Sequence, residues 1–261
     1  MRTPTAFLRS SVLALLLGAC AVTSANALAL SCPVHDAAFA TKLPSGVEAT
    51  ATPHRLIVIG FMGGRVDAAN AVHRELMVAQ QLQKRYPQAV HAAVFANHDE
   101  KSALRAVLTQ LDDDKDGCLS ATEKTGARVV IYGHSWGASE TVALARKLND
   151  LGIPVLLTVQ VDSVQKPNHQ DGLIPPNVGE AINFYQTEGL LHGRTTIVAM
   201  NPKRTKILGN FQSSYKGQPV DCAGYPWFAR TFMKAHIEIE NDPTVWDKIE
   251  ALIGTKVVEP A

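Results

Sequence analysis

The sequence has 261 residues, of which 46% are hydrophobic and 19% charged, with 25 Lys and Arg against 24 Asp and Glu. This balance is typical of a globular protein and excludes a disordered or fibrous chain. A net charge of +1 without a basic segment gives no indication of nucleic-acid binding. The length suits one large domain, which we expect to be a monomer.

The first 29 residues are typical of a signal peptide, so we expect export to the periplasm, the cell envelope or the medium. Two arginines precede an apolar run from 11 to 22 that is too short to cross a bilayer. Two processing sites compete: cleavage after Ala29, or a lipobox-like LGAC sequence that would place a lipid anchor on Cys20. No later segment is long and apolar enough for a transmembrane helix.

Three cysteines follow the signal peptide: Cys32, Cys118 and Cys222. Export to an oxidising compartment favours one disulfide and leaves one thiol free. We prefer the pair Cys32–Cys222, which would tie the start of the mature chain to the segment before His236. The sequence alone does not fix this pairing.

Residues 30–53 form an N-terminal extension, and residues 54–261 form a domain in which apolar, β-branched runs alternate with amphipathic segments. Strands are predicted over 54–60, 90–97, 128–133, 154–161 and 195–200, and helices over 67–86, 101–111, 138–148, 178–185 and 243–254. Asp242 is the expected N-cap of the last helix. Residues 201–228 have no clear period. The alternation predicts an α/β fold, with a mostly parallel sheet and helices on both faces.

The segment Gly133–Gly137, GHSWG, matches G-x-S-x-G and stands between a predicted strand and a predicted helix. Such a turn holds the serine in a strained backbone conformation, and its glycines let strand and helix approach closely. Ser135 would project beyond the carboxyl ends of the strands, where open parallel sheets bind ligands. The alternative is a glycine-rich turn that contains a serine by chance.

GHSWG, together with GFMGG about seventy residues earlier, resembles the α/β-hydrolase superfamily, and its lipases and esterases in particular. The resemblance covers the chain from about His54 to Ile253. It implies the α/β-hydrolase fold and the order serine, acid, histidine along the chain. It also implies oxyanion donors at the backbone N–H of Trp136 and at that of Phe61 or Met62.

His236 is the candidate base, because it follows all predicted strands and a serine hydroxyl needs a base to take its proton. Many superfamily members carry the acid after the strand that corresponds here to 195–200, but no carboxylate ends that strand. Others carry it one strand earlier, where Asp162 stands, with Asp171 and Asp221 as alternatives. The acid would orient the imidazole of His236.

These residues predict an exported serine hydrolase that cleaves carboxylic esters of lipids or small acyl groups through an acyl-enzyme. No cofactor is expected for catalysis. A thioesterase or phospholipase on the same fold is one alternative. A non-catalytic, calcium-binding envelope protein is the other, since a fold does not imply an activity.

Residues 112–123, DDDKDGCLSATE, resemble an EF-hand or dockerin-type calcium loop. Too few residues follow the loop for a full exiting helix. Because it precedes the third predicted strand, the loop lies at the sheet end opposite Ser135, and Ca²⁺ there would be structural. The expected ligands are Asp112, Asp114, Asp116, Cys118 through its backbone carbonyl, Ser120 and Glu123.

Overall fold

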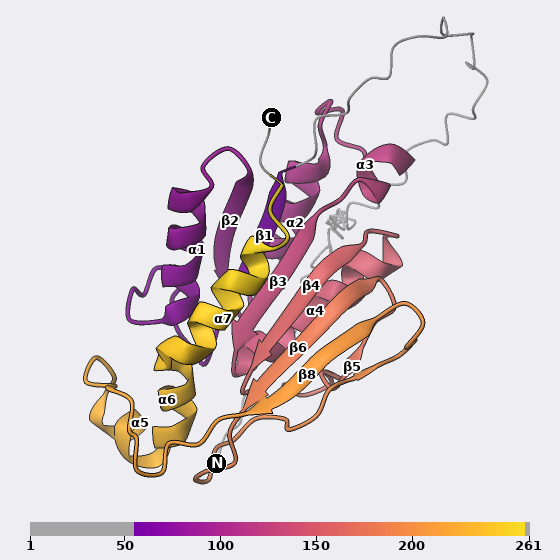
Figure 1. Ribbon diagram of the computed structural model, residues 1–261. Coiled ribbons are helices and arrows are strands. Elements are labelled where there is room, and N and C mark those ends of the chain that lie inside the picture. Colours follow the sequence, from indigo (N-terminus) through magenta and orange to yellow (C-terminus); the bar gives the residue numbers. More distant parts are fainter. Residues whose placement is uncertain (1–54, 259–261) are drawn as a thin grey trace, which may run out of the picture. The chain divides into compact units, whose positions relative to one another are not determined.

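The computed structural model of the protein describes residues 55–258 (Figure 1). The predicted signal peptide and the extension over residues 30–53, with Cys20 and Cys32, lie outside these residues, so export and lipid anchoring stay predictions. Among the helices of the described part, none has the length and apolar character needed to cross a membrane.

Six parallel strands form the central sheet, in the order β2-β1-β3-β4-β6-β8. Because every neighbouring pair in it is parallel, the carboxyl ends of all six strands lie at the same end of the sheet. Two short strands, β5 and β7, pair with each other separately. The bounds are β1 Leu56–Met62, β2 Val90–Ala96, β3 Val129–His134, β4 Val155–Val161, β5 Leu173–Ile174, β6 Val178–Tyr185, β7 Val198–Ala199 and β8 Lys206–Gln212.

Helices cover both faces of this sheet (Figure 1). On one face, α1, α6 and α7 bury apolar side chains such as Leu82, Ile239 and Ile249 against the strands. On the other face, α2 and α4 do the same with side chains such as Val107 and Leu144. The predicted fold class is therefore confirmed. The bounds are α1 Arg74–Arg85, α2 Glu100–Leu111, α3 Ala121–Thr125, α4 Trp136–Asp150, α5 Trp227–Phe232, α6 Lys234–Asn241 and α7 Pro243–Gly254.

The order of elements differs from the prediction after β4. Residues 178–185, predicted as a helix, form strand β6. Its neighbours β4 and β8 lie on either side, and a strand buried on both faces does not alternate apolar with polar residues. Only Val198–Ala199 of the predicted strand 195–200 is a strand, and the sheet ends instead with β8, inside a stretch that was expected to be irregular.

The predicted Cys32–Cys222 disulfide is wrong, because Cys222 is a free thiol. Cys118, expected to be the leftover thiol, is disulfide-bonded. The Cys222 side chain packs against the small cluster of Tyr225, Ala229 and Ile237. Burial, followed by the charges of the acidic side chains nearby, raises the pKa of Cys222 to about 11, so this thiol is a poor partner for oxidation at neutral pH.

Candidate active site

Ser135 occupies a sharp turn between β3 and α4, with φ 56° and ψ −123°. This left-handed region is costly for a residue with a side chain, so the surrounding structure has to hold it. The two flanking glycines make the turn fit. A Cβ on Gly137 would lie 2.1 Å from the Phe61 carbonyl oxygen, and a Cβ on Gly133 would lie 2.6 Å from the Gly137 backbone. The strained serine and the close strand–helix approach both follow the expectation for this motif.

Two hydrogen bonds join three side chains that the sequence places 27 to 101 residues apart. His236 Nε2 lies 2.8 Å from Ser135 Oγ, and His236 Nδ1 lies 2.6 Å from Asp162 Oδ2. All three side chains are buried. The candidate base stands in helix α6. The hydroxyl can thus donate to Nε2 while the Nδ1–H donates to the carboxylate.

Asp162 directly follows β4 and is held as an acceptor of several hydrogen bonds. Its Oδ1 accepts from the backbone N–H of Gly193 at 2.8 Å, and its Oδ2 accepts from Gln186 Nε2 at 2.7 Å. Burial by itself would raise the pKa of Asp162, but the hydrogen bond and charge of His236 and the Gln186 bond bring that pKa below its usual value. Asp162 is therefore an anion at neutral pH.

The two alternative acids do not reach His236. Asp171 is buried, where it accepts from Ser163 Oγ at 2.6 Å and from Arg194 Nε at 2.9 Å. Asp221 is exposed and accepts from the backbone N–H of Ala223. Of the three aspartates considered, only Asp162 contacts the candidate base.

Backbone donors near Ser135 come from two places. Helix α4 begins at Trp136, whose N–H belongs to the first turn. Phe61 and Met62 lie inside β1, are fully buried and do not line the cavity at Ser135, whereas the following Gly63 and Gly64 do. The Gly63 N–H already donates to Glu75 Oε1 at 3.3 Å. Gly64 is therefore the first residue after β1 that lines this cavity and whose N–H is not engaged by Glu75.

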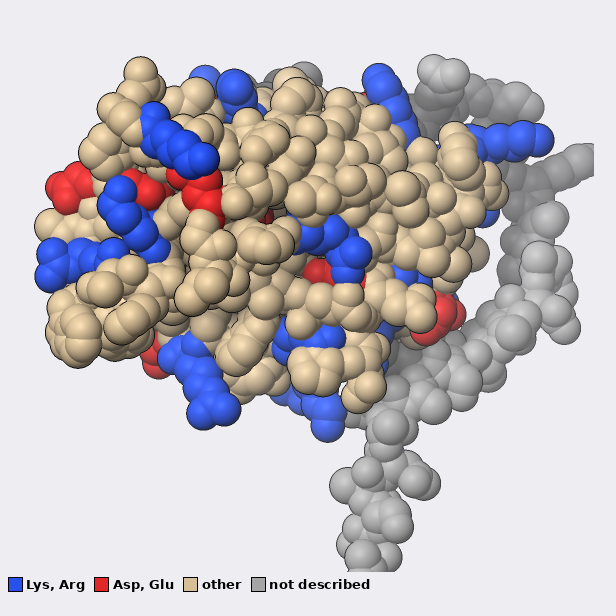
Figure 2. Space-filling model, turned by 90° about the horizontal axis from the view of Figure 1, so that it is seen from below, with Lys and Arg blue, Asp and Glu red and all other residues tan. Residues whose placement is uncertain are grey.

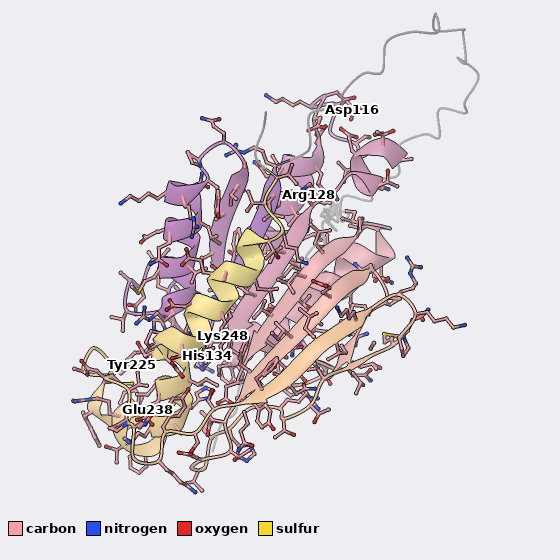
Figure 3. All side chains as sticks on the ribbon, viewed as in Figure 1. Asp116, Arg128, His134, Tyr225, Glu238 and Lys248 are labelled. Atoms are coloured by element: carbon pink, nitrogen blue, oxygen red, sulfur yellow. The ribbon has the colours of Figure 1, made fainter. Side chains whose placement is uncertain are left out.

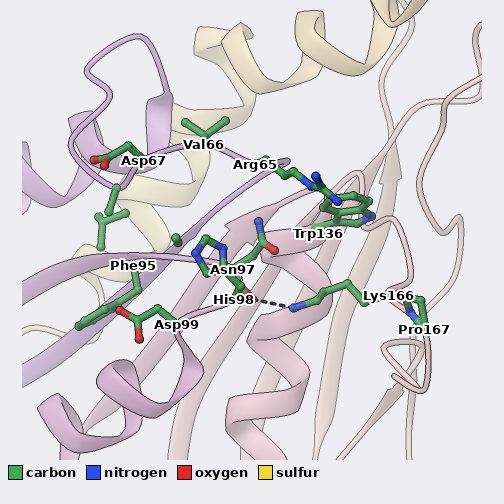
Figure 4. Close-up of a pocket in the computed structure, with 13 residues that line it drawn as sticks. Arg65, Val66, Asp67, Phe95, Asn97, His98, Asp99, Trp136, Lys166 and Pro167 are labelled. Carbon is green, nitrogen blue, oxygen red and sulfur yellow. Dashed lines mark hydrogen bonds between the residues drawn. The ribbon is translucent and has the colours of Figure 1, made fainter.

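Two hollows lie at this end of the sheet, and Arg65 and Val66 line both. The smaller, of about 420 Å³, is lined by Ser135 and His236 and has an apolar wall that includes Phe228 of α5 and Ile237 of α6. The larger, of about 900 Å³, lies beside Trp136 and Lys166 (Figure 4). There Lys166 Nζ donates to the Asn97 carbonyl oxygen at 2.6 Å. Both hollows combine apolar and polar walls, and Lys166 and Asn97 line only the larger one.

A cluster of buried titratable side chains beside the site was missed by sequence reasoning: His73, Glu75, His134 and Glu240. His134 precedes the nucleophile, and its ring centroid lies 4.5 Å from that of His236. Burial lowers the pKa of His134 to about 4. His73 and Glu240 are 167 residues apart, so no local pattern could have joined them. Their only sequence signal is that Glu240 follows His236 by one helical turn.

The calcium-like loop lies at the other end of the sheet. Figure 3 shows Asp116 far from His134 and Tyr225. Carboxylate oxygens of Asp112, Asp114 and Asp116 lie within 4.8 Å of one another, and Gly117 adopts φ 82°. Glu123 and Ser120 form the capping box of the short helix α3, and these bonds to Ser120 hold the pKa of Glu123 below its usual value.

Neither a protein-family model nor a curated protein matches this sequence. Solved structures are similar at low identity. A RedJ structure with a PEG molecule in its active site is 11% identical over 82% of this chain and 96% of that one, with a TM-score of 0.42. A cutinase-like protein from Cryptococcus sp. is 11% identical over 81% and 98%, with a TM-score of 0.41.

A dienelactone hydrolase-like promiscuous phosphotriesterase from metagenomic libraries is 16% identical over 81% of this chain and 90% of that one, with a TM-score of 0.37. Identity and TM-score are low in each case, so the chemistry of the site has to be inferred from the residues of this chain. The chain is an α/β protein with a parallel sheet. The hydrogen-bonded side chains of Ser135, His236 and Asp162 lie beyond the carboxyl ends of its strands.

Proposed function

We propose that the protein is a serine hydrolase of the α/β-hydrolase type that cleaves carboxylic esters. The observation that carries this proposal is the continuous chain of hydrogen bonds from Ser135 Oγ through His236 to Asp162. A serine hydroxyl becomes a useful nucleophile only when a neighbouring base takes its proton, and that base works best when an anion orients it.

The reaction has two matched halves. Ser135 Oγ attacks the acyl carbon while its proton passes to His236 Nε2, and the tetrahedral intermediate expels the alcohol, which takes the proton from His236. Water then attacks the acyl-enzyme by the same route, which releases the acid and restores the Ser135 hydroxyl. Asp162 stays ionised throughout and stabilises the imidazolium of His236.

The negative oxygen of each tetrahedral intermediate needs donors that are already in position. We assign one donor to the backbone N–H of Trp136, where the positive end of the α4 dipole also points. For the second we prefer the N–H of Gly64 to those of Phe61 and Met62, because the Gly63–Gly64 turn lines the cavity that holds Ser135.

We place the acyl group and the alcohol group of the ester in different hollows. The 420 Å³ cavity suits the acyl group, since α5 and α6 supply part of its wall with apolar side chains such as Phe228 and Ile237. The larger hollow beside Trp136 suits the leaving alcohol, because it has hydrogen-bonding groups and is open. Thioesters and phospholipids fit the same arrangement and are the alternative substrates.

Labelling with a fluorophosphonate probe, followed by peptide mapping, tests the proposal. We expect the probe to modify Ser135, and the His236→Ala variant to lose this labelling. Ser139→Ala is the matched control, because Ser139 is a buried serine one helical turn later and contacts neither His236 nor Asp162. A folded protein that takes up no probe would instead favour the non-catalytic envelope protein.

We also propose that residues 112–123 bind Ca²⁺ as a structural ion. The donor set fits, because the loop brings three carboxylates together and Asp112 Oδ1 is enclosed with no hydrogen-bond partner in the described part of the chain. Asp112, Asp114, Asp116, Ser120, Glu123 and the Cys118 carbonyl would hold the ion. It would have no part in the reaction.

Calcium binding is tested by melting temperature. Calcium should raise the melting temperature of the wild-type protein by several degrees relative to chelator, because an ion that binds only the folded state stabilises it by mass action. Asp112→Asn should lose most of this shift, whereas Asp150→Asn, an exposed aspartate at the end of α4, should keep it. An equal shift in both variants would contradict the loop as the binding site.

A further inference from the structure

Four buried side chains converge beside the cavity lined by Ser135, and ester hydrolysis uses none of them. Their exposed fractions are 8% for His73, 0% for Glu75, 2% for His134 and 2% for Glu240. They come from the start of α1, the end of β3 and the end of α6. His73, His134 and Glu240 also line the cavity, which gives a small ion a route to them.

The ligand-type atoms of this cluster face one another. One nitrogen of His73 and one carboxylate oxygen each of Glu75 and Glu240 lie within 4.8 Å of one another. His73 Nδ1 contacts Glu240 Oε1, and His134 Nδ1 lies 3.2 Å from Glu240 Oε2. One imidazole nitrogen, from His73, and two carboxylates therefore surround one point, while His134 contacts the other oxygen of the Glu240 carboxylate.

Two of these atoms are unsatisfied. In the described part of the chain, Glu75 Oε2 and His134 Nδ1 are enclosed and make no hydrogen bond. His134 Nε2 lies 3.1 Å from the His236 carbonyl oxygen, which can only accept, so Nε2 carries a hydrogen. In a neutral ring, Nδ1 then presents a lone pair to the Glu240 carboxylate. Facing lone pairs and two buried carboxylates need a cation.

We propose that His73, Glu75 and Glu240 bind a divalent transition-metal ion of the Zn²⁺ type. One imidazole nitrogen and two carboxylate oxygens, with a water molecule in the fourth position, are a donor set that Zn²⁺ accepts in tetrahedral geometry. With bonds of about 2.1 Å, tetrahedral ligand atoms are roughly 3.4 Å apart. The three ligand atoms lie within 4.8 Å of one another, so the side chains have to close in on the ion to reach that spacing. This site goes beyond the proposed hydrolase activity and is separate from the calcium loop.

The rival occupant of this point is a proton. Burial, and then the charge of Glu240, raises the pKa of Glu75 well above its usual value, and a protonated Glu75 would relieve the carboxylate repulsion. A proton at this point predicts no metal binding. The two occupants therefore differ in a measurable way.

The bound ion would act by position. Glu240 stands one turn after His236 in α6, and His134 donates from Nε2 to the His236 carbonyl oxygen. An ion held by Glu240, whose other carboxylate oxygen contacts His134, would therefore fix the end of α6 beside the proposed base. We infer no step of the reaction at the metal.

Titration of the metal-free protein with Zn²⁺, and separately with Co²⁺, tests the site without any substrate. Calcium is kept saturating, so that residues 112–123 do not take up the added ion. We expect one equivalent to bind, a visible Co²⁺ absorption typical of tetrahedral coordination, and affinities weakened by at least about 10–100-fold in Glu75→Gln and Glu240→Gln. His169→Gln, in a loop outside the cluster, should bind as the wild type does.

Wild-type protein that binds no stoichiometric metal overturns the proposal in favour of the shared proton. Glutamine variants that bind as tightly as the wild type overturn it as well. If either glutamine variant fails to fold, as judged by circular dichroism, His73→Gln replaces it, because His73 is the most exposed of the three ligands. Fluorophosphonate labelling of Ser135 is measured in parallel, so failure of the metal site and failure of the hydrolase proposal remain separate results.

Discussion

Both carboxylate oxygens of Asp162 are held by hydrogen bonds. Its two oxygens accept from the backbone N–H groups of Gln186 and Gly193, from Gln186 Nε2 and from His236. The residue adopts φ 44°, and a Cβ on Gly193 would lie 2.1 Å from its carbonyl carbon. The acid is thus held in a strained position by neighbours that only an ionised carboxylate satisfies.

Replacing Asp162 with asparagine should lower kcat by about 10³–10⁴-fold with little change in KM, since the amide cannot stabilise the His236 imidazolium or fix its tautomer. Steady-state hydrolysis of a chromogenic short-chain ester measures this. Asp171→Asn is the matched control, because Asp171 is equally buried but contacts Ser163 and Arg194 instead of His236. Similar losses in the two variants would argue against Asp162 as the acid.

At the scale of the elements, local patterns predicted β1 to β4 and the last helix, and failed for the strands after β4. Strands β1 to β4 are apolar, β-branched runs, and α2, α4 and α7 have clear apolar stripes, so each is marked by its own residues. Residues 178–185 carry apolar side chains at helical spacing, and only burial between β4 and β8 makes them a strand. Tertiary context decided these residues, as it often does for short apolar runs.

The site follows the same division. Ser135 has a local motif, and Asp162 and His236 could be placed from the order of elements. The cluster around Glu240 could not, because α1, β3 and α6 meet only in the folded chain. Gly63 and Gly64 also belong to a local motif, GFMGG. The sequence locates the end of β1 only to within one or two residues, so it could not separate Met62 from Gly64.

The start of α7 allows a test at the element scale. Asp242 Oδ1 accepts from the Thr244 N–H at 2.8 Å, and Oδ2 accepts from the Tyr215 hydroxyl at 3.0 Å. Asp242→Ala should lower the free energy of unfolding by about 1–2 kcal/mol, through the loss of the helix cap. Urea denaturation measures it, with the exposed Asp247→Ala in the same helix as the control. Equal midpoints for the two variants would show that the cap contributes nothing.

Across the whole domain, the proposed catalytic site and the proposed calcium ion lie at opposite ends of the strands of one sheet. Figure 2 views the molecule from the end where the strands have their carboxyl ends, and it shows Lys and Arg side chains spread over that surface, with fewer Asp and Glu. The acidic loop of residues 112–123 lies at the opposite end of the sheet, where β3 begins. Removal of calcium should therefore change stability while leaving the rate at room temperature nearly unchanged.

Acid should destabilise the domain partly through Asp162. Its pKa is lower in the folded protein than the usual 3.8, so its contribution to stability is present above about pH 4 and is lost as the pH falls through the folded value. The free energy of unfolding of Asp162→Asn should fall less steeply with pH in this range than that of the wild type. Urea denaturation at a series of pH values from neutral to about 3 compares them, and parallel curves would contradict the assignment.

No neighbouring pair of strands in the central sheet can start as a hairpin, because all of them run parallel. Each pairing has to wait until a connecting segment, usually a whole helix, has closed back on the sheet. The chain therefore pays loop-closure entropy many times before its sheet is complete, and refolding should be slow for a domain of this size. Partly folded chains expose the edges of apolar strands during that delay, which makes aggregation the main competitor of refolding at high protein concentration.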